Sequence, residues 1–196
     1  MKQHITEQLA SLPGHNGMYF KNLITGETIA YQAEESFRPA SVIKLPIFMH
    51  ICRLAQECRV LMDEKIRCRH SDKLGGCGAL RAFTDEPEVS VATLCELMIT
   101  ISDNSATNLL IRRFGIDSLN DAFREMGLSV TRLNRLLFDS EAAARGIENE
   151  FSPREVGDLL EQVWRRKFVD ETTSIYAEDM LLKQQINHKI PGIIGD

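Results

Sequence analysis

Near the start of the chain lies the sequence Pro39-Ala40-Ser41-Val42-Ile43-Lys44-Leu45-Pro46-Ile47-Phe48. Apolar residues fall on all sides of any helix drawn from Val42 to Phe48, a pattern typical of a helix buried in a protein core. Ser41 and Lys44 are three residues apart, so they share one face of that helix. The stretch predicts a core helix whose first turn carries a serine beside a lysine in apolar surroundings.

The lysine in this stretch is suited to act as a base. Burial disfavours the charged ammonium group and lowers the pKa of a lysine, so Lys44 is able to take the proton from the Ser41 hydroxyl. Two structural interpretations stay open: Ser41 is merely a helix N-terminal hydroxyl, and Lys44 extends its charge to the surface along an apolar stem. Pro46 is expected to bend the helix, because it removes one intrahelical hydrogen bond.

A second motif, Ser102-Asp103-Asn104, occurs further along the chain. A given tripeptide is expected by chance in only about 0.03 of such chains, whereas Ser-x-x-Lys is expected about once per chain. The stretches Val91 to Thr100 and Ser105 to Phe114 read as helices, which places the motif at a tight corner between them. The three residue types also suit an ordinary turn. Together, however, the two motifs supply the hydroxyls, lysine and amide of a serine acyl-transfer site.

On these residues the sequence resembles the serine penicillin-recognising enzymes, and within them the class A β-lactamases. The resemblance extends from about Asn22 to Gly195 and covers most of the chain. Its parts follow in the family's order: the turn Thr25-Gly26-Glu27, the nucleophile helix, Gly75-Gly76-Cys77-Gly78 at the cleft edge, and Ser102-Asp103-Asn104 continuing into Ala106-Thr107-Asn108-Leu109-Leu110. It implies an α/β (α+β) fold in which a helical lobe joins an antiparallel sheet with helices on both faces.

The resemblance also implies a role for each motif residue. Ser41 would be the acylated nucleophile, Lys44 its base, and Ser102 the shuttle that carries a proton to the leaving nitrogen. Asn104 would hold the carbonyl of the substrate's side chain, and the backbone N–H of Ser41 would form half of an oxyanion hole. The implied substrate is a small-molecule β-lactam or related amide, and no metal or other cofactor is implied.

The loop that carries the deacylating glutamate in class A enzymes is different here. Its Glu-Pro-Glu-Leu-Asn signature is replaced by the stretch from Arg135 to Ala144, and counting from Ser102 or from Ser152-Pro153 puts an apolar residue at the glutamate's place. Asp139 and Glu141 are the nearest carboxylates and the candidate deacylation bases. They can equally be solvated acids of a short helix. Efficient removal of the acyl group is therefore in question.

The family's third motif, Lys-Thr-Gly or Lys-Ser-Gly, is absent from this sequence. Only Gly17 to Asn22 and Glu27 to Gln32 read as strands, joined in a hairpin that is marginally stable by itself. Most other segments read as helices, and Ser152-Pro153-Arg154-Glu155 predicts a helix start with a capping box. Gln184 to Asp196 ends in a turn that leads toward a strand. We therefore expect a truncated family member that lacks the C-terminal strands.

This expectation divides the chain into three parts. Residues 1–40 form the N-terminal helix and the β-hairpin of the α/β lobe, residues 41–182 form a mostly helical lobe that carries the catalytic motifs, and residues 183–196 begin the return to the α/β lobe. An exposed edge of the incomplete sheet would allow self-association.

Composition limits the classes of partner. With 196 residues, 43% of them hydrophobic, the chain can bury a sizeable core. Its formal net charge of −5, with basic residues interspersed among acids, argues against a nucleic-acid partner. No transmembrane run is visible, so no membrane partner is expected. The first residues lack the apolar core of a secretory signal, which favours a cytoplasmic protein, or an exported one if a signal has been removed.

Five cysteines, an odd number, favour free thiols over a disulfide framework. The resemblance places Cys95 at one position of a disulfide found in some class A enzymes; Phe48 stands at the other position, and Cys52 one helical turn later is a substitute. A zinc site is a further alternative, disfavoured because no Cys-x-x-Cys pair occurs. Its ligands would be Cys58, Cys68, His70 and Cys77.

The sequence therefore predicts a serine hydrolase of the class A β-lactamase type, acylated at Ser41 by a β-lactam or related amide and then hydrolysed. A peptidase or amidase with the same Ser/Lys/Ser site is one alternative. A non-catalytic homologue that binds a β-lactam or a partner without turnover is the other.

Overall fold

The computed structural model describes residues 2–188 and contains helices together with two small antiparallel sheets. The elements follow in the order α1 (Lys2–Ser11), β1 (Met18–Lys21), β2 (Thr28–Tyr31), α2 (Lys44–Gln56), β3 (Lys65–Arg67), β4 (Glu88–Ser90), α3 (Val91–Thr100), α4 (Asn104–Phe114), α5 (Ile116–Glu125), α6 (Ser140–Ala144), α7 (Pro153–Trp164) and α8 (Glu171–Leu182). The mixture confirms the expected α+β class. The turn expected from Pro191 onward lies outside the described residues.

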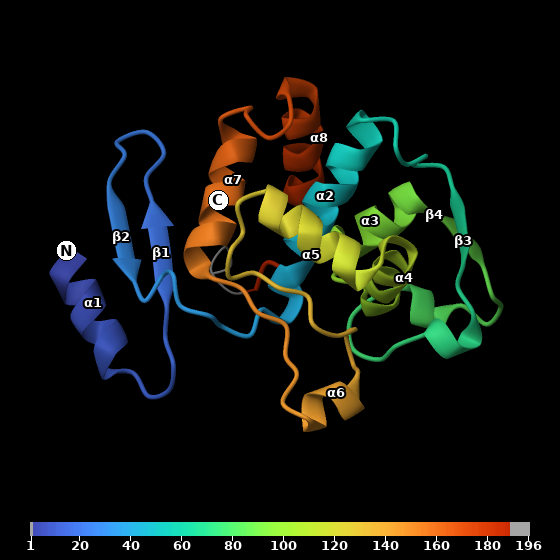
Figure 1. Ribbon diagram of the computed structural model, residues 1–196, viewed down its shortest axis with the longest axis horizontal. Helices are drawn as coiled ribbons and strands as arrows, with labels where there is room; N and C mark the ends of the chain where they lie inside the picture. Colours follow the sequence, from blue (N-terminus) through green and yellow to red (C-terminus); the bar gives the residue numbers. More distant parts are fainter. Residues whose placement is uncertain (1, 189–196) are drawn as a thin grey trace.

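Helix α2 lies at the centre of the helical lobe, in contact with α3, α5, α7 and α8 (Figure 1). Every residue from Lys44 to Cys52 is buried, which confirms the predicted core helix. Each large apolar side chain buried in this way contributes about 1.5–3 kcal/mol to folding. Pro46 lies in the first turn of α2, where backbone N–H groups have no intrahelical partner. A proline is tolerated there, because its missing N–H does not remove the hydrogen bond that it would remove further along a helix.

The predicted hairpin is confirmed, with β1 and β2 antiparallel in the register that pairs Met18 with Tyr31 and Lys21 with Thr28. Helix α7 contacts β1 and helix α1 contacts β2, so the hairpin lies between two helices (Figure 1). Within residues 2–188 these two strands pair with each other alone. The self-association through a sheet edge stays a prediction.

A second strand pair, β3 with β4, was not predicted, and the expectation of a single hairpin was wrong in this respect. The two strands are antiparallel, with Lys65 opposite Ser90 and Arg67 opposite Glu88. Each has three residues, and of the six just Val89 is fully buried. Both strands alternate polar, apolar and polar residues, but three residues are too few for this pattern to indicate a strand.

The start of α7 confirms one half of the predicted capping box. The Ser152 hydroxyl accepts a hydrogen bond from the backbone N–H of Glu155 at 3.3 Å, as an N-cap does. The second half was wrong, because the Glu155 carboxylate does not accept a hydrogen bond from the start of its own helix. It binds the turn that precedes the helix in the sequence. It accepts hydrogen bonds from Ser129 Oγ (3.1 Å), the N–H groups of Val130 and Thr131 (both 2.8 Å) and Thr131 Oγ1 (2.6 Å).

Among residues 2–188, none of the helices is long and apolar enough to cross a lipid bilayer.

Replacing Glu155 by Gln is expected to lower the free energy of unfolding by about 2–3 kcal/mol at neutral pH, because an amide oxygen replaces an ionised acceptor of four donors. Burial raises the pKa of the Glu155 carboxyl, but hydrogen bonds from Thr131, Val130 and Ser129 outweigh it and leave the pKa lowered. The contribution is therefore complete above the unfolded pKa of about 4.3 and lost as the pH falls through the lower folded value.

Urea unfolding of wild type and Glu155→Gln, at neutral pH and in acid, measures this difference. The exposed Glu27 at the hairpin turn supplies the matched control, since Glu27→Gln should change stability by less than about 0.5 kcal/mol. If the difference in the free energy of unfolding between wild type and Glu155→Gln is as large in acid as at neutral pH, the expected pH dependence is contradicted.

Candidate active site

The serine and lysine of the first motif occupy the junction between a short 3-10 turn, Ala40–Ile43, and α2. Ser41 is exposed, whereas Lys44 is the first residue of α2 and only 2% exposed. Lys44 therefore does not carry its charge to the surface. The hydroxyl faces the solvent side and the amine lies beneath it, within the protein.

The Lys44 ammonium group is surrounded by oxygen acceptors. It donates to the carbonyl oxygen of Ser102 at 2.7 Å, to Ser102 Oγ at 2.8 Å and to Asn104 Oδ1 at 2.9 Å, while Ser41 Oγ lies at 3.4 Å. Three short contacts match the three N–H bonds of a charged lysine. A buried cation is tolerated when its hydrogen bonds are satisfied in this way.

Ser102 lies at the corner where α3 ends and α4 begins, as predicted. Its φ of 57° is in the left-handed region, which costs a residue other than glycine about 1–2 kcal/mol. The carbonyl and the hydroxyl of this one residue both contact Lys44. Glycine would adopt this conformation without strain, but it has no hydroxyl to contact the Lys44 amine. The strained backbone at this position therefore comes together with a side chain that glycine cannot supply.

Asp103 joins the corner to the glycine-rich loop. Its Oδ1 accepts from the N–H of Ala106 at 2.9 Å, which caps α4 and starts that helix one residue earlier than predicted. Its Oδ2 accepts from the N–H groups of Ala79 (2.7 Å) and Leu80 (2.9 Å). A Cβ on Gly78 would lie 2.3 Å from Cγ of Asp103, so a glycine is required where the loop passes this carboxylate.

Asn104 is held from both sides of its amide. Its Oδ1 accepts from Lys44, and its Nδ2 donates to the carbonyl oxygen of Gly75 at 3.1 Å. Its backbone N–H donates to the carbonyl oxygen of Cys77 at 3.3 Å. The amide orientation is thereby fixed by the buried amine on one side and by the loop on the other.

Burial lowers the pKa of Lys44 to about 8, and the nearby Cys77 and Asp103 oppose this shift. About one Lys44 side chain in ten is then neutral at pH 7, compared with far fewer for an exposed lysine. The pKa lies in the range in which an amine can act as a general base near neutral pH.

The shortest route for a proton from Ser41 to Lys44 passes through Ser102. The two serine hydroxyl oxygens are 2.8 Å apart, and Ser102 Oγ is 2.8 Å from Lys44 Nζ, compared with 3.4 Å for the direct contact. Ser102 can receive the Ser41 proton while it passes its own to the neutral amine. This arrangement can activate Ser41 as a nucleophile.

A cavity of about 640 Å³ opens beside Ser41. Gly76, Cys77 and Asn104 line it on the side of the glycine-rich loop. The other lining residues come from the segment before Ser41 and from the long loop around α6: Arg38, Pro39, Ala40, Arg135, Leu137, Phe138, Asp139, Ser140, Ala143, Glu148 and Asn149. Sequence reasoning named Asp139 among these but missed the two arginines, Phe138, Glu148 and Asn149.

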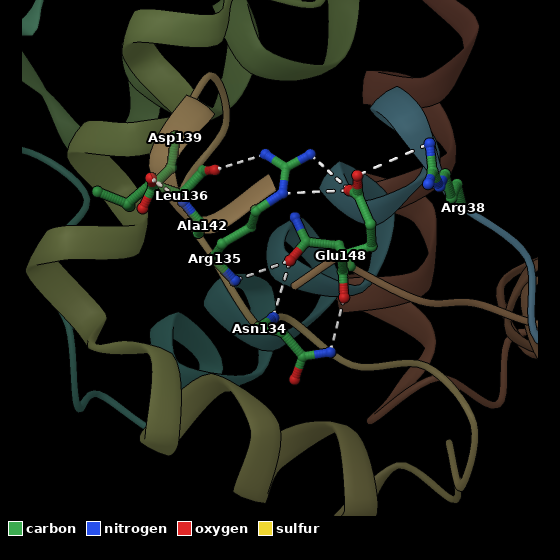
Figure 2. A network of polar contacts seen from close by, with 8 residues as sticks. Arg38, Asn134, Arg135, Leu136, Asp139, Ala142 and Glu148 are labelled. Carbon is green, nitrogen blue, oxygen red and sulfur yellow. Dashed lines mark hydrogen bonds and ion pairs between the residues drawn. The ribbon is translucent and has the colours of Figure 1, made fainter. Parts of the chain in front are cut away.

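The base of the long loop is closed by a polar network (Figure 2). The Arg135 guanidinium donates to Glu148 Oε2 through Nη2 (2.6 Å) and Nε (3.2 Å) and to the Leu136 carbonyl oxygen at 3.0 Å. Asn149 Oδ1 accepts from the N–H groups of Asn134 (2.8 Å) and Arg135 (3.0 Å). The hydrogen bond from Arg135 lowers the pKa of Glu148, although burial opposes it. The network holds the two ends of the loop together.

The two candidate deacylation bases have different positions. Asp139 lines the cavity, but its Oδ1 accepts from the N–H of Ala142 at 2.9 Å and so caps α6. Glu141 is an exposed residue in the first turn of α6 and is not among the residues that line the cavity. The role of either as a base stays a prediction.

Leu137 also lines the cavity, and Asn108 of α4 fixes its backbone. The Asn108 side chain donates to the Leu137 carbonyl oxygen at 2.9 Å and accepts from the Leu137 N–H at 3.0 Å. An apolar side chain is therefore held at this point of the wall.

Cys52 and Cys95 are free and buried, so the structure does not contain the disulfide between them. Burial raises the pKa of Cys95 to about 12 and raises that of Cys52 as well, which keeps both thiols protonated. Among residues 2–188, no three His, Cys, Asp or Glu side chains are grouped so as to hold a metal ion. The zinc alternative therefore has no support from these residues.

Comparison with known proteins places this geometry in context. The model of the β-lactamase enzyme family matches residues 1–196. β-Lactamase ROB-1 of Haemophilus influenzae is 28% identical over 142 residues, which cover 71% of this chain and 46% of that protein. This chain spans less than half the length of ROB-1 and of β-lactamase BRO-1 of Moraxella catarrhalis, which it also matches.

Solved structures give the same comparison in three dimensions. A β-lactamase from Sphaerobacter thermophilus superimposes with a TM-score of 0.89 at 26% identity, covering 100% of this chain and 73% of that one. A variant of PBP-A in an acyl-enzyme complex with penicillin G gives a TM-score of 0.87 at 29% identity, covering 97% of this chain and 71% of that one.

Lys44 should titrate near pH 8 in the folded protein, because burial destabilises its charged form. NMR of protein carrying ¹³C at the lysine ε-carbons measures the titration directly. One lysine resonance should move with this midpoint and disappear in Lys44→Met. A spectrum in which no lysine resonance moves with a midpoint near pH 8 would contradict the lowered pKa of Lys44.

Proposed function

The chain belongs to the β-lactamase enzyme family, and we propose that it reacts with β-lactams by acylation of Ser41, with hydrolysis of the acyl-enzyme as a slower second step. The observation that carries the proposal is the hydroxyl relay from an exposed Ser41 through Ser102 to a buried amine with a pKa of about 8. The acyl-enzyme complex of a PBP-A variant with penicillin G supports it, because that structure resembles this one over 97% of the chain.

In the acylation step, Ser41 Oγ attacks the lactam carbonyl carbon. Its proton passes to Ser102 as Ser102 gives its own proton to neutral Lys44. When the lactam C–N bond breaks, the proton returns from Lys44 through Ser102 to the ring nitrogen, so the side chains regain their starting protonation states. Such positioned proton transfer contributes about 10²–10⁴ to the rate.

In this proposal, Asn104 orients the substrate. The amide nitrogen carries two N–H bonds, and one of them donates to Gly75. We assign the other to the carbonyl of the substrate's side chain. Because Lys44 and Gly75 already fix the amide, substrate binding carries no further entropic cost of ordering this side chain.

Release of the acyl group is proposed to be slow, which gives the protein the character of a penicillin-binding protein. Leu137 lies on the cavity wall that would face the acyl group. The Asn108 side chain holds the backbone of Leu137 with two hydrogen bonds. Asp139 lines the same cavity, but its carboxylate is engaged as the cap of α6. Neither residue is placed to activate a water molecule as a free carboxylate would be.

Incubation with benzylpenicillin should add the mass of one penicillin to the protein, at Ser41. Ser41→Ala should abolish the adduct, because it removes the hydroxyl that the relay through Ser102 to Lys44 activates. Lys44→Ala should slow acylation by at least about 10²-fold. The rate should rise with pH and level off above about 8, since neutral Lys44 is the active form.

Intact-mass analysis and time courses across pH measure these effects. Lys65→Ala, at an exposed lysine on β3, is the matched control and should leave the rate unchanged. An adduct that persists in Ser41→Ala would remove the assignment.

Hydrolysis should show a burst equivalent to one penicillin per protein, followed by slow steady release. Leu137→Glu should speed the release, because it places a carboxylate on the cavity wall at a fixed backbone position. Asp139→Asn should leave the release rate unchanged, because asparagine caps a helix as well as aspartate does. Rapid steady hydrolysis that disappears in Asp139→Asn would instead identify Asp139 as the base.

A further inference from the structure

We propose that Phe138 is a specificity-determining residue, which selects acyl donors that carry a flat aromatic group on the side chain next to the amide. The inference rests on the proposed function, since it names the class of β-lactam that the same site accepts. Four features of Phe138 carry it: its exposure, its backbone conformation, the clamps on both sides and its position opposite Gly76.

Phe138 is an unfavourable residue at its position unless something binds to it. Its side chain is 59% exposed although it is aromatic, and it lines the cavity beside Ser41. Its φ of 61° is left-handed, a conformation in which a bulky residue is an outlier. Asparagine or glycine would fill this position without either cost. Such costs tend to persist where a side chain contacts a ligand.

The conformation persists because the residues on both sides of Phe138 are fixed. Asn108 holds the N–H and the carbonyl of Leu137. On the other side, the Asp139 side chain caps α6. The backbone of Phe138 therefore has little freedom to turn, and its ring stays at the cavity instead of folding onto the outer surface.

The ring and the Asn104 amide flank the same point of the cavity. A Cβ placed on Gly76 would lie 3.3 Å from Cζ of Phe138 and 3.0 Å from Nδ2 of Asn104. Gly76 thus keeps open the space between them, with a φ of 78° that also favours glycine. A substrate whose amide carbonyl binds Nδ2 of Asn104 places the next group of its side chain against the ring of Phe138.

The surroundings of the ring favour an apolar group over a charged one. Leu137 and Ala143 line the cavity from the same loop and from α6. The charges of the lining are largely matched, because Arg135 pairs with Glu148 at 2.6 Å and Arg38 lies 3.7 Å from the same carboxylate. Two aromatic rings in contact gain about 0.5–1.5 kcal/mol beyond the area they bury.

The test compares two penicillins that share the side-chain amide and differ in a phenyl ring: benzylpenicillin and 6-acetamidopenicillanic acid. The ratio of their second-order acylation rates is measured for wild type, Phe138→Asn and Phe138→Tyr. Asparagine keeps the left-handed preference and removes the ring, whereas tyrosine keeps the ring. Phe138→Asn should lower the ratio about tenfold, and Phe138→Tyr should keep it within about twofold. Phe83→Ala, at an exposed phenylalanine that does not line this cavity, should leave it unchanged.

The outcomes separate this inference from the proposed function. A ratio that is the same in wild type and Phe138→Asn, with acylation intact, overturns the role of Phe138 and leaves the proposed function standing. Absence of acylation by either penicillin overturns the proposed function. Binding is then measured by saturation-transfer NMR with phenylacetylglycine and acetylglycine. Transfer to the phenyl ring that is lost in Phe138→Asn supports the role of Phe138, and transfer that is absent or equal in both proteins overturns it.

Discussion

The burial of one ammonium group is the constraint on which the rest of the site depends. Lys44 begins the helix that forms the centre of the core, so its position follows from the packing of α2. Removing the amine from water lowers its pKa and makes it a base, but it also demands acceptors for every N–H bond. Ser102 and Asn104 supply those acceptors, and the proposed reaction uses the side chains of the same two residues. Stability and reactivity therefore require the same contacts.

Backbone strain is concentrated around this group and its cavity. Ala40, Ser102 and Phe138 have φ values of 46°, 57° and 61°, although none is a glycine. Other left-handed residues, such as Cys58 and Arg166, follow the ends of helices, where this conformation commonly terminates a helix. Ser102 follows the end of α3 in the same way, whereas Ala40 and Phe138 follow no helix. Ala40 and Phe138 line the cavity and Ser102 contacts Lys44, so the strained residues lie where strain is expected at a functional site.

The sequence predicts those parts of this structure whose signal is local. Helix α3 has the predicted bounds, Val91–Thr100, and the core position of α2 followed from apolar residues on all its sides. The bonds of Arg135 to Glu148 and of Asn108 to Leu137 join residues that no periodicity relates, so no spacing rule could reveal them. The left-handed conformation of Phe138 could not be predicted from the sequence for a different reason: phenylalanine is among the residues least expected at positive φ.

The two halves of the proposed reaction depend on different parts of the fold. The groups for acylation come from the 3-10 turn before α2, from α2 itself and from the α3–α4 corner, and burial fixes Lys44, Ser102 and Asn104. The group for deacylation would have to come from the loop around α6. Arg135 and Glu148 join the two ends of this loop (Figure 2), and Asn108 holds the backbone of Leu137 near its start. A loop fixed in this way cannot bring a distant carboxylate to the acyl group by moving. In the proposed reaction, the side chain at the held position would therefore decide whether the acyl group is released quickly, while the core would decide whether it forms at all.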